Sequence, residues 1–264
     1  MSAEVVTYEL DGAIAVIGLN RPDKRNALNE AVFNGLFEAV TRAWGEAKVG
    51  IVFGHGEHFS AGLDLAQLAE RMGDAGRRRR RNRFRNAFEA IERGEIPFLS
   101  ALTGAVVGGG LELAAATHIR VADEKAFFAL PEGQRGIFVG GGGSVRISRL
   151  MSVARMTDMM LTGRVLDAHE GERLNLCQYV VPSGQALAKC KELAIRIAGN
   201  SPHSNYAIAS GLPRLRDLPH DDGLYFEGLV AGSTMGPEAF ERIRAFLEKR
   251  AEPLGLPQKP EQGN

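Results

Sequence analysis

Three short segments of the sequence combine glycine with carboxyl groups in ways that suit catalysis. They are HFSAGLDL at 58–65, GGGLELA at 108–114 and LPEG at 130–133. Glycine adopts backbone angles that other residues avoid, so a glycine turn can point a free N–H group, such as that of Leu63, into a cleft. Three glycines that open a helix add unpaired N–H groups and a partial positive charge, which suits an anion or a developing oxyanion.

Each segment also has a purely structural interpretation. Residues 58–65 fit an ordinary strand-to-helix turn capped by Asp64, and residues 108–110 fit close packing of a helix against a strand. Glu112 in a first helical turn and Glu132 after an apolar strand both fit capping roles. The alternative is that two carboxyls with raised pKa values move protons beside a carbonyl oxygen held by two N–H groups. Residue types alone leave both interpretations open.

The elements that must position these segments alternate between strands and helices. Apolar runs predict strands at 13–19, 50–53, 98–103 and 119–122, and a shorter one at 126–130. Asn29 is the predicted N-cap of a helix with apolar residues at 33, 36, 37, 40 and 44. This alternation predicts an α/β fold with a mainly parallel sheet. Further helices are predicted at 143–162, 183–199, 203–210, 222–232 and 236–250, which makes the C-terminal third helical.

Composition excludes several classes of protein. Of 264 residues, 44% are hydrophobic and 24% charged, so neither disorder nor a coiled coil describes the whole chain. Lys+Arg and Asp+Glu are both 32, which removes any global electrostatic argument for nucleic acid or acidic membranes. Two cysteines make no disulfide framework, and neither a signal peptide nor a membrane-length apolar run is present. We expect a soluble protein of the cytoplasm.

Taken together, the motifs resemble the enoyl-CoA hydratase/isomerase, or crotonase, family. The motifs that carry the resemblance are NRPDKRNALN at 20–29, FSAGLDL at 59–65, VVGGGLELAAATHIRVAD at 106–123, FFALPEGQRGIFVGGGGS at 127–144 and LTGR at 161–164. The resemblance implies an α/β crotonase-like spiral of ββα units with C-terminal trimerisation helices, and trimers that often pair as hexamers. It divides the chain into a core at 1–195 and a helical trimerisation region and tail at 196–264.

The resemblance also implies an activity. Crotonases bind acyl-CoA thioesters and stabilise an enolate with two backbone N–H groups, which fall on Leu63 and Gly109. The two glutamates of hydratases match Glu112 and Glu132, so the expected reaction adds water to the 2,3 double bond of a trans-2-enoyl-CoA. No metal or separate cofactor is expected, because coenzyme A is part of the substrate. The expected substrate contacts are Lys24, Arg25, Ala27, Ala61, Gly62, Asp64, Leu65, Gly108 and Gly140.

Details of the motifs bear on the branch of the family. Dienoyl isomerases place an acid eight residues after the second glutamate, where this chain has Gly140, and isomerases typically keep only the second acid. Val139 stands where hydratases commonly have proline, and Pro131–Ser144 resembles methylthioacryloyl-CoA hydratases, which also hydrolyse their thioester. A hydratase-hydrolase and an isomerase of another acyl-CoA are therefore the alternatives to a simple hydratase.

An arginine run, RRRRRNRFR at 77–85, stands apart from the catalytic motifs. Phe84, Phe88 and Ile91 give it helical spacing, with 66–76 before it as a candidate lid over the ligand. The run fits a solvated helix face, a contact to CoA phosphates or an RNA-binding helix, and the zero net charge disfavours RNA. His55 and His58 have metal-like spacing but no third ligand, so no metal site is predicted.

Overall fold

The computed structural model describes residues 4–70 and 86–250 of the chain. The chain divides into two compact units with bounds Met1–Pro213 and Arg214–Asn264. The boundary predicted at residue 195 lies earlier than this division and stays a prediction. The arginine run at 77–85 and the part of the predicted lid at 71–76 fall outside the described residues.

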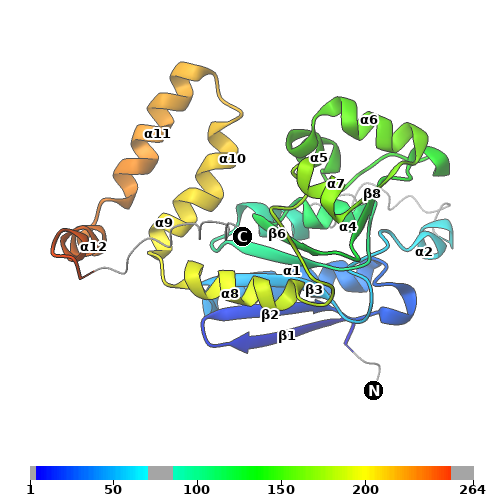
Figure 1. Cartoon of the computed structure of the whole chain (residues 1–264), viewed down its shortest axis with the longest axis horizontal. Coiled ribbons are helices and arrows are strands. Elements are labelled where there is room, and N and C mark those ends of the chain that lie inside the picture. Colours follow the sequence, from blue (N-terminus) through cyan, green and yellow to red (C-terminus); the bar gives the residue numbers. More distant parts are fainter. Residues whose placement is uncertain (1–3, 71–85, 251–264) are drawn as a thin grey trace, which may run out of the picture. The chain divides into compact units, whose positions relative to one another are not determined.

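A six-stranded sheet forms the centre of the first unit (Figure 1). Its order is β1-β2-β3-β4-β6-β9, and β1 is antiparallel to β2 while every other neighbouring pair is parallel. The strands are β1 (Val6–Asp11), β2 (Ile14–Leu19), β3 (Val49–Gly54), β4 (Phe98–Leu102), β6 (Ile119–Asp123) and β9 (Tyr179–Val181). The predicted α/β fold with a mainly parallel sheet is confirmed, although β1 and β9 were not predicted.

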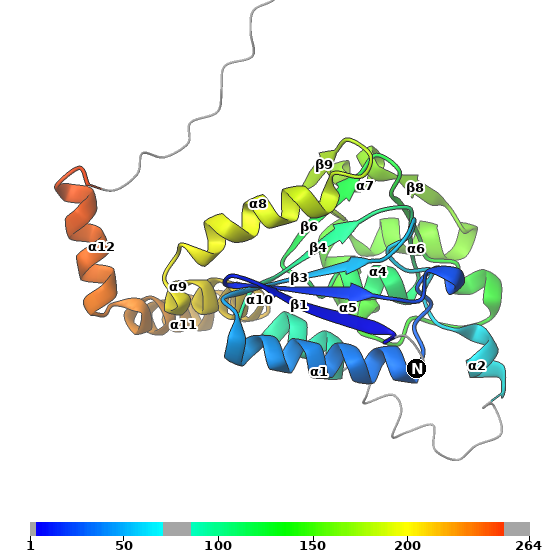
Figure 2. The same ribbon diagram turned by 90° about the horizontal axis from the view of Figure 1, so that it is seen from below.

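Helices cover both faces of this sheet (Figure 2). Alternate residues of β2 point to opposite faces, so Ile14 and Val16 pack with α8 (Ala186–Ala198), whereas Ala15 and Ile17 pack with α1 (Glu30–Glu46). Because both faces are buried, the central strands β2, β3 and β4 are almost entirely apolar, with Ser100 the polar exception among them, as is usual for parallel sheets. Asn29 caps α1 as predicted, since its side chain accepts a hydrogen bond from the Val32 N–H.

A second sheet of three short strands lies beside the first. It consists of β5 (Ala105–Val107), β7 (Phe127–Ala129) and β8 (Val165–Asp167), with β5 parallel and β8 antiparallel to β7. A single bridge between Ser60 and Val106 joins β5 to the segment that follows β3. This bridge brings the first predicted catalytic turn to the second.

The helical part differs from the prediction mainly at one break. Ser152 adopts a φ of 80° and divides the predicted helix at 143–162 into α5 (Gly143–Met151) and α6 (Val153–Thr162). The other helices are α2 (Leu65–Glu70), α4 (Gly109–Ala114), α7 (Ala168–Arg173), α9 (Pro202–Tyr206), a π-helical turn (Ala207–Gly211), α10 (Leu212–Leu215), α11 (His220–Thr234) and α12 (Pro237–Leu247), besides a helical segment at 86–93 and 3₁₀ turns at Pro22–Lys24 and Gly133–Arg135. No helix among the described residues is both long and apolar enough to cross a membrane.

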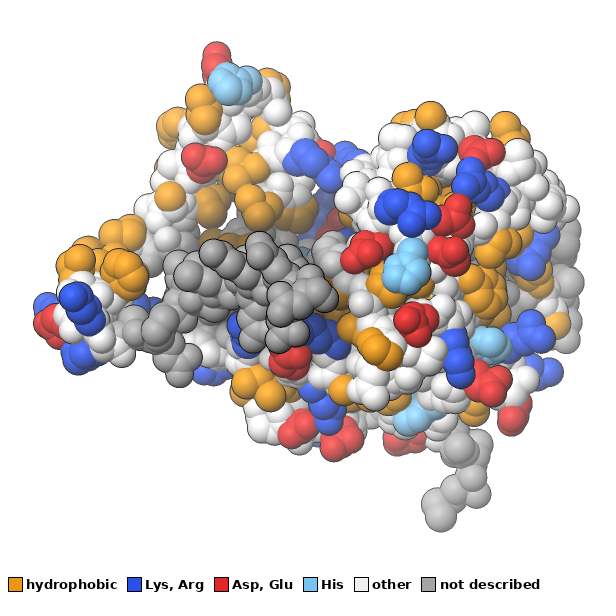
Figure 3. All heavy atoms as spheres, viewed as in Figure 1, with side chains coloured by type: hydrophobic (Ala, Val, Ile, Leu, Met, Phe, Trp, Pro, Cys, Tyr) orange, Lys and Arg blue, Asp and Glu red, His pale blue; other side chains and the backbone are white. Residues whose placement is uncertain are grey.

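The second unit contains α11 and α12, and neither helix has a buried residue. Their exposed apolar side chains appear as hydrophobic patches in Figure 3. The exposed residues include Leu224, Tyr225, Leu229, Phe240, Ile243, Phe246 and Leu247.

Candidate active site

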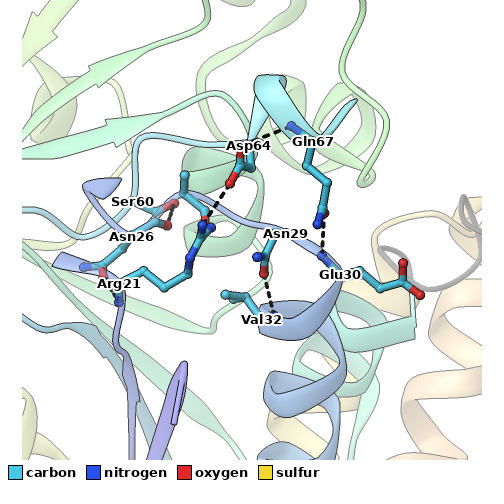
Figure 4. Close-up of polar contacts among 9 residues, drawn as sticks. Arg21, Asn26, Asn29, Glu30, Val32, Ser60, Asp64 and Gln67 are labelled. Atoms are coloured by element: carbon cyan, nitrogen blue, oxygen red, sulfur yellow. Dashed lines mark hydrogen bonds and ion pairs between the residues drawn. The ribbon is translucent and has the colours of Figure 1, made fainter. Parts of the chain in front are cut away.

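The turn at 58–65 is held by a set of polar contacts shown in Figure 4. The Ser60 hydroxyl donates to the Asn26 carbonyl at 2.9 Å, and the Arg21 guanidinium forms an ion pair of 2.9 Å with Asp64. Gln67 accepts a hydrogen bond from the Glu30 N–H, which fastens α2 to the start of α1. Burial raises the pKa of Asp64, but hydrogen bonds, the one from Arg21 first, more than offset this and hold it below its usual range. These contacts fix the turn that carries Leu63.

Gly62 lies where this turn meets the start of α4. Its φ is +89°, and a Cβ at this position would lie 2.6 Å from the Val107 carbonyl oxygen and 3.1 Å from the Gly109 nitrogen. A Cβ on Gly109 would in turn lie 3.5 Å from the Leu63 nitrogen. The N–H groups of Leu63 and Gly109 therefore sit on adjoining segments. Neither donates a hydrogen bond to another of the described residues.

Glu112 projects from the first turn of α4 and is 3% exposed. Its Oε1 accepts hydrogen bonds from the N–H groups of Gly141 and Gly143, each at 2.8 Å. A Cβ on Gly143 would come within 2.6 Å of the Glu112 side chain, so only glycine fits this approach. The carboxylate thus binds a distant glycine loop rather than capping its own helix, and the capping interpretation of Glu112 is wrong.

Glu132 follows β7 and is 6% exposed. It precedes the 3₁₀ turn at Gly133–Arg135 without making a side-chain cap, and its Oε2 has no hydrogen-bond partner among the described residues. Its Oε1 faces Gly108, where a Cβ would lie only 2.8 Å away. Since Gly108 immediately precedes Gly109, the Glu132 carboxyl lies beside the candidate oxyanion hole. The capping interpretation is wrong here too.

The pKa values of both carboxyls are raised, for partly different reasons. Burial raises the pKa of Glu112, and the N–H groups of Gly143, Gly141 and Gly140 and the charge of Arg146 oppose it. Burial also raises the pKa of Glu132, its own N–H opposes it, and the negative charge of Glu112 raises it further. The charge of Glu112 therefore couples the ionisation of Glu132 to that of Glu112. Carboxyls with raised pKa values that are coupled in this way can serve as general acid and general base.

The predicted substrate-binding residues at 24–28 and 61–65 lie side by side. The Ala61 N–H donates to the Arg25 carbonyl at 2.9 Å, the Leu28 N–H donates to the Gly62 carbonyl at 2.8 Å, and the Asp64 N–H donates to the Leu28 carbonyl at 3.0 Å. Lys24 and Arg25 thus lie beside the turn that carries Leu63. Gly140 lies next to the glycines that bind Glu112 and is exposed. Contacts of these residues with a ligand stay predictions.

The histidines flanking the first turn have structural partners. His55 Nε2 lies 2.8 Å from the Thr7 hydroxyl, and His58 Nδ1 accepts from the Ala105 N–H at 3.1 Å. Within residues 4–70 and 86–250, no group of three or more metal-binding side chains is clustered. Cys177 and Cys190 are both buried free thiols, and burial raises the pKa of each to about 12.

Arg146 was missed by the sequence analysis. It is 9% exposed in α5 and donates to the Gly141 carbonyl at 2.8 Å. That bond uses Nη1, and Nη2 forms an ion pair of 2.7 Å with Glu92, which lies on the helical segment at 86–93. Arg146 lies four residues after Gly142 of the glycine run, and this proximity is the one feature of the sequence that indicates a role for Arg146 in the site.

Comparison with known proteins identifies the family of the chain. Residues 9–255 match the profile of the family described as enoyl-CoA hydratase/isomerase. The chain belongs to this family. It is 31% identical to the enoyl-CoA hydratase EchA19 of Mycobacterium tuberculosis, over 92% of this chain and 93% of the relative, and 30% identical to the short-chain-enoyl-CoA hydratase of Clostridium acetobutylicum, over 95% and 97%.

A solved structure from Rhodopseudomonas palustris extends the match to three dimensions. It is 46% identical, superimposes with a TM-score of 0.88, and covers 93% of this chain and 95% of its own. The predicted crotonase-like fold is therefore confirmed, and with it the assignment of the motifs at 20–29, 59–65, 106–123 and 127–144 to this enzyme family.

Proposed function

We propose that this protein is an enoyl-CoA hydratase that adds water across the 2,3 double bond of a trans-2-enoyl-CoA thioester. The observation that carries the proposal is that two buried carboxyls, Glu112 and Glu132, the charge of the first raising the pKa of the second, adjoin the segments of Leu63 and Gly109, whose N–H groups no described residue accepts. Family membership and the hydratase names of the relatives support the same reaction.

The N–H groups of Leu63 and Gly109 bind the thioester carbonyl oxygen in this proposal. Negative charge develops on that oxygen only as water adds to Cβ, so the two donors stabilise the transition state more than the bound substrate. Gly62 is essential to this arrangement because a Cβ there would collide with the backbone of Val107.

The two glutamates divide the proton transfers. Glu112, whose ionised form is favoured by the N–H groups of Gly141 and Gly143, accepts a proton from the attacking water. Glu132, whose buried Oε2 has no hydrogen-bond partner among the described residues, begins protonated and gives its proton to Cα. One water thereby contributes hydroxyl to Cβ while Cα gains hydrogen, and a proton passing from Glu112 to Glu132 restores the starting state. The reaction needs no group beyond the chain, the thioester and water.

Coenzyme A binding is assigned to the paired segments 24–28 and 61–65. The positive charges of Lys24 and Arg25 suit its phosphates. The backbone groups of Ala61 and Leu65, with Asp64 held by Arg21, suit its adenine and pantetheine parts. Ala27, Gly108 and Gly140 complete the surface proposed to face the substrate.

Self-association is part of the proposal. The second unit has helices with no buried residue and with exposed Leu224, Tyr225, Phe240 and Phe246. Burial of such exposed apolar side chains against another protein surface is favourable, because it removes them from water. A second copy of the chain is the partner we propose, in a trimer or a pair of trimers. Light scattering after gel filtration tests this, and a monomer at micromolar concentration would contradict it.

The activity is tested with crotonyl-CoA and mass spectrometry. We expect the thioester to gain the mass of one water, and Glu112→Gln and Glu132→Gln to abolish the gain. Glu192→Gln is the matched control, because Glu192 is an exposed glutamate of α8 paired with Lys189. No gain of water with crotonyl-CoA or longer enoyl-CoA thioesters would contradict the proposal. Release of free CoA together with hydration would assign the protein to the hydrolysing alternative.

A further inference from the structure

We infer that Arg146 is a positioning residue: with Glu92 it holds the glycine loop in the one arrangement that aims two backbone N–H groups at Glu112. The inference rests on the proposed function for its catalytic consequence. Its structural part, the order of residues 140–144, can be tested without any reaction.

The chain of contacts is continuous from Glu92 to Glu112. Glu92 forms a 2.7 Å ion pair with Arg146, and Arg146 donates to the Gly141 carbonyl at 2.8 Å. The N–H of that same Gly141 donates to Glu112 Oε1 at 2.8 Å. Both polar backbone groups of Gly141 are therefore engaged, one by Arg146 and one by the candidate base.

We call Arg146 and Glu92 together the clamp. The loop needs the clamp because it consists of four glycines in succession, 140–143. Glycine loses more conformational freedom on ordering than any other residue, so a run of four does not hold one conformation by itself. Gly142 adopts a φ of +98°, and a Cβ there would lie 2.3 Å from the Arg146 guanidinium. The guanidinium thus packs directly against the loop that it bonds.

The helical segment at 86–93 supplies the other side of the clamp. Phe88 is 1% exposed, and its ring lies 2.7 Å from where a Cβ on Gly141 would be. Glu92, one turn further along the same segment, holds Arg146. The segment therefore contacts the glycine loop through an apolar ring and through an ion pair, and its position sets that of the loop.

Removing the clamp should change the pKa of Glu112 in a predictable direction. The Arg146 charge and the glycine N–H groups both favour ionised Glu112, so their loss raises the pKa of Glu112. The acidic limb of the kcat profile then moves to higher pH, because a higher pH is needed to ionise the base. Misplacement of a catalytic group by about 1 Å lowers kcat by up to about 100-fold.

The test compares Arg146→Gln with Arg120→Gln. Arg120 is the matched control because it is also buried and also donates to backbone carbonyls, those of Leu176 and Thr117, while among the described residues no hydrogen bond or ion pair joins it to the glycine loop or to Glu112. We expect Arg146→Gln to lower kcat with KM unchanged, to shift the acidic limb upward, and to speed hydrogen–deuterium exchange at 140–144. Arg120→Gln should lower the melting temperature without moving the acidic limb.

Milder variants guard against loss of folding. Glu92→Gln keeps an acceptor for Arg146 and Arg146→Lys keeps the charge, so each should show the same changes at smaller amplitude. An unshifted acidic limb and unchanged exchange at 140–144 in these variants and in Arg146→Gln would overturn the inference. If the wild type hydrates no enoyl-CoA, the proposed function fails, whereas the exchange measurement still decides whether the clamp exists.

Discussion

The regions around Glu112 and Glu132 bury their carboxyls to a similar extent but give them opposite surroundings. At Glu112 the glycine loop supplies N–H donors from Gly141 and Gly143 to one oxygen. At Glu132 one carboxyl oxygen is buried with no partner among the described residues. Burial disfavours a charged carboxylate in both places. Glycine N–H groups and the charge of Arg146 oppose this at Glu112, whereas its own N–H group and the charge of Arg135 oppose it at Glu132.

This difference teaches how one site can hold a base and an acid of the same residue type. Donors to a carboxylate favour the ionised form, whereas a desolvated oxygen favours the protonated form. The negative charge of Glu112 raises the pKa of Glu132 further, so ionising the first helps to keep the proton on the second. The four predictions below test this contrast, from the largest expected effect to the smallest.

Replacing each acid by its amide should give the largest effect on activity. Glu112→Gln and Glu132→Gln should each lower kcat by about 100- to 10,000-fold, as expected for loss of a general acid or base. Their stabilities should diverge, because Glu132→Gln removes a desolvated carboxyl whereas Glu112→Gln replaces one that accepts two N–H bonds. Steady-state kinetics and thermal denaturation measure both. Equal destabilisation by the two substitutions would contradict the difference between the surroundings of Glu112 and Glu132.

Gly62→Ala should lower kcat by about 100- to 1,000-fold, the usual cost of losing one oxyanion donor. A Cβ at this φ of +89° would collide with the Val107 carbonyl and approach the Gly109 nitrogen, so the Leu63 turn must move. Both acids keep their surroundings in this variant. The acidic limb of its pH profile should therefore match that of the wild type, and a shifted limb would mean that the oxyanion hole and the acids are not separable.

Gly143→Ala should disturb Glu112 while leaving Glu132 in place. The added Cβ would lie 2.6 Å from the Glu112 side chain, which should lower kcat by about 10- to 100-fold and stability by about 1–3 kcal/mol. Gly45→Ala is the control, because this glycine lies in α1 with no atom within 4 Å of an added Cβ. The control should instead gain about 0.5–1 kcal/mol. Chemical denaturation measures the stabilities and steady-state kinetics the activities. Equal activity in both variants would contradict the close approach of Gly143 to Glu112.

The smallest effect concerns stability against pH. Both glutamates have folded-state pKa values above the ordinary 4.5. At a pH between 4.5 and these raised values, the folded protein therefore binds more protons than the unfolded chain. The free energy of unfolding should therefore be greatest below pH 4.5 as far as these two groups are concerned, and fall as the pH rises through their folded-state pKa values. Denaturation of the wild type and of Glu112→Gln/Glu132→Gln at several pH values should show a flatter dependence in the double variant. An unchanged slope would contradict the raised values.

Long elements with a clear period were predictable from the sequence. The cap at Asn29, the apolar spacing of α1 and the continuous apolar strands β2 and β3 lie where the residues indicated, because each pattern is local. The edge strand β1 and the three-residue strands β5 and β8 escaped detection. Strands of three residues are too short to show a period, and β1 has an exposed half.

The candidate site was predictable only in part. Glu112, Glu132 and the glycine turns were recognisable as motifs, but the partners of Glu112 lie 29 and 31 residues away in a glycine run without side chains. Arg146 looked like one of many exposed arginines, since its burial depends on Glu92, which lies 54 residues earlier in the chain. Ser152 divides α5 from α6 without a glycine or proline to mark the break.

The division of roles between the two acids can be measured most directly by hydrogen exchange at Cα of a saturated thioester. Butyryl-CoA has no double bond to hydrate, so exchange of its α-hydrogen in D₂O, followed by proton NMR, isolates the step assigned to Glu132. Removal of the α-hydrogen reverses that step and needs ionised Glu132, so above the folded-state pKa of Glu132 we expect exchange by the wild type and by Glu112→Gln, and none by Glu132→Gln. Exchange that persists in Glu132→Gln while Glu112→Gln loses it would contradict the account.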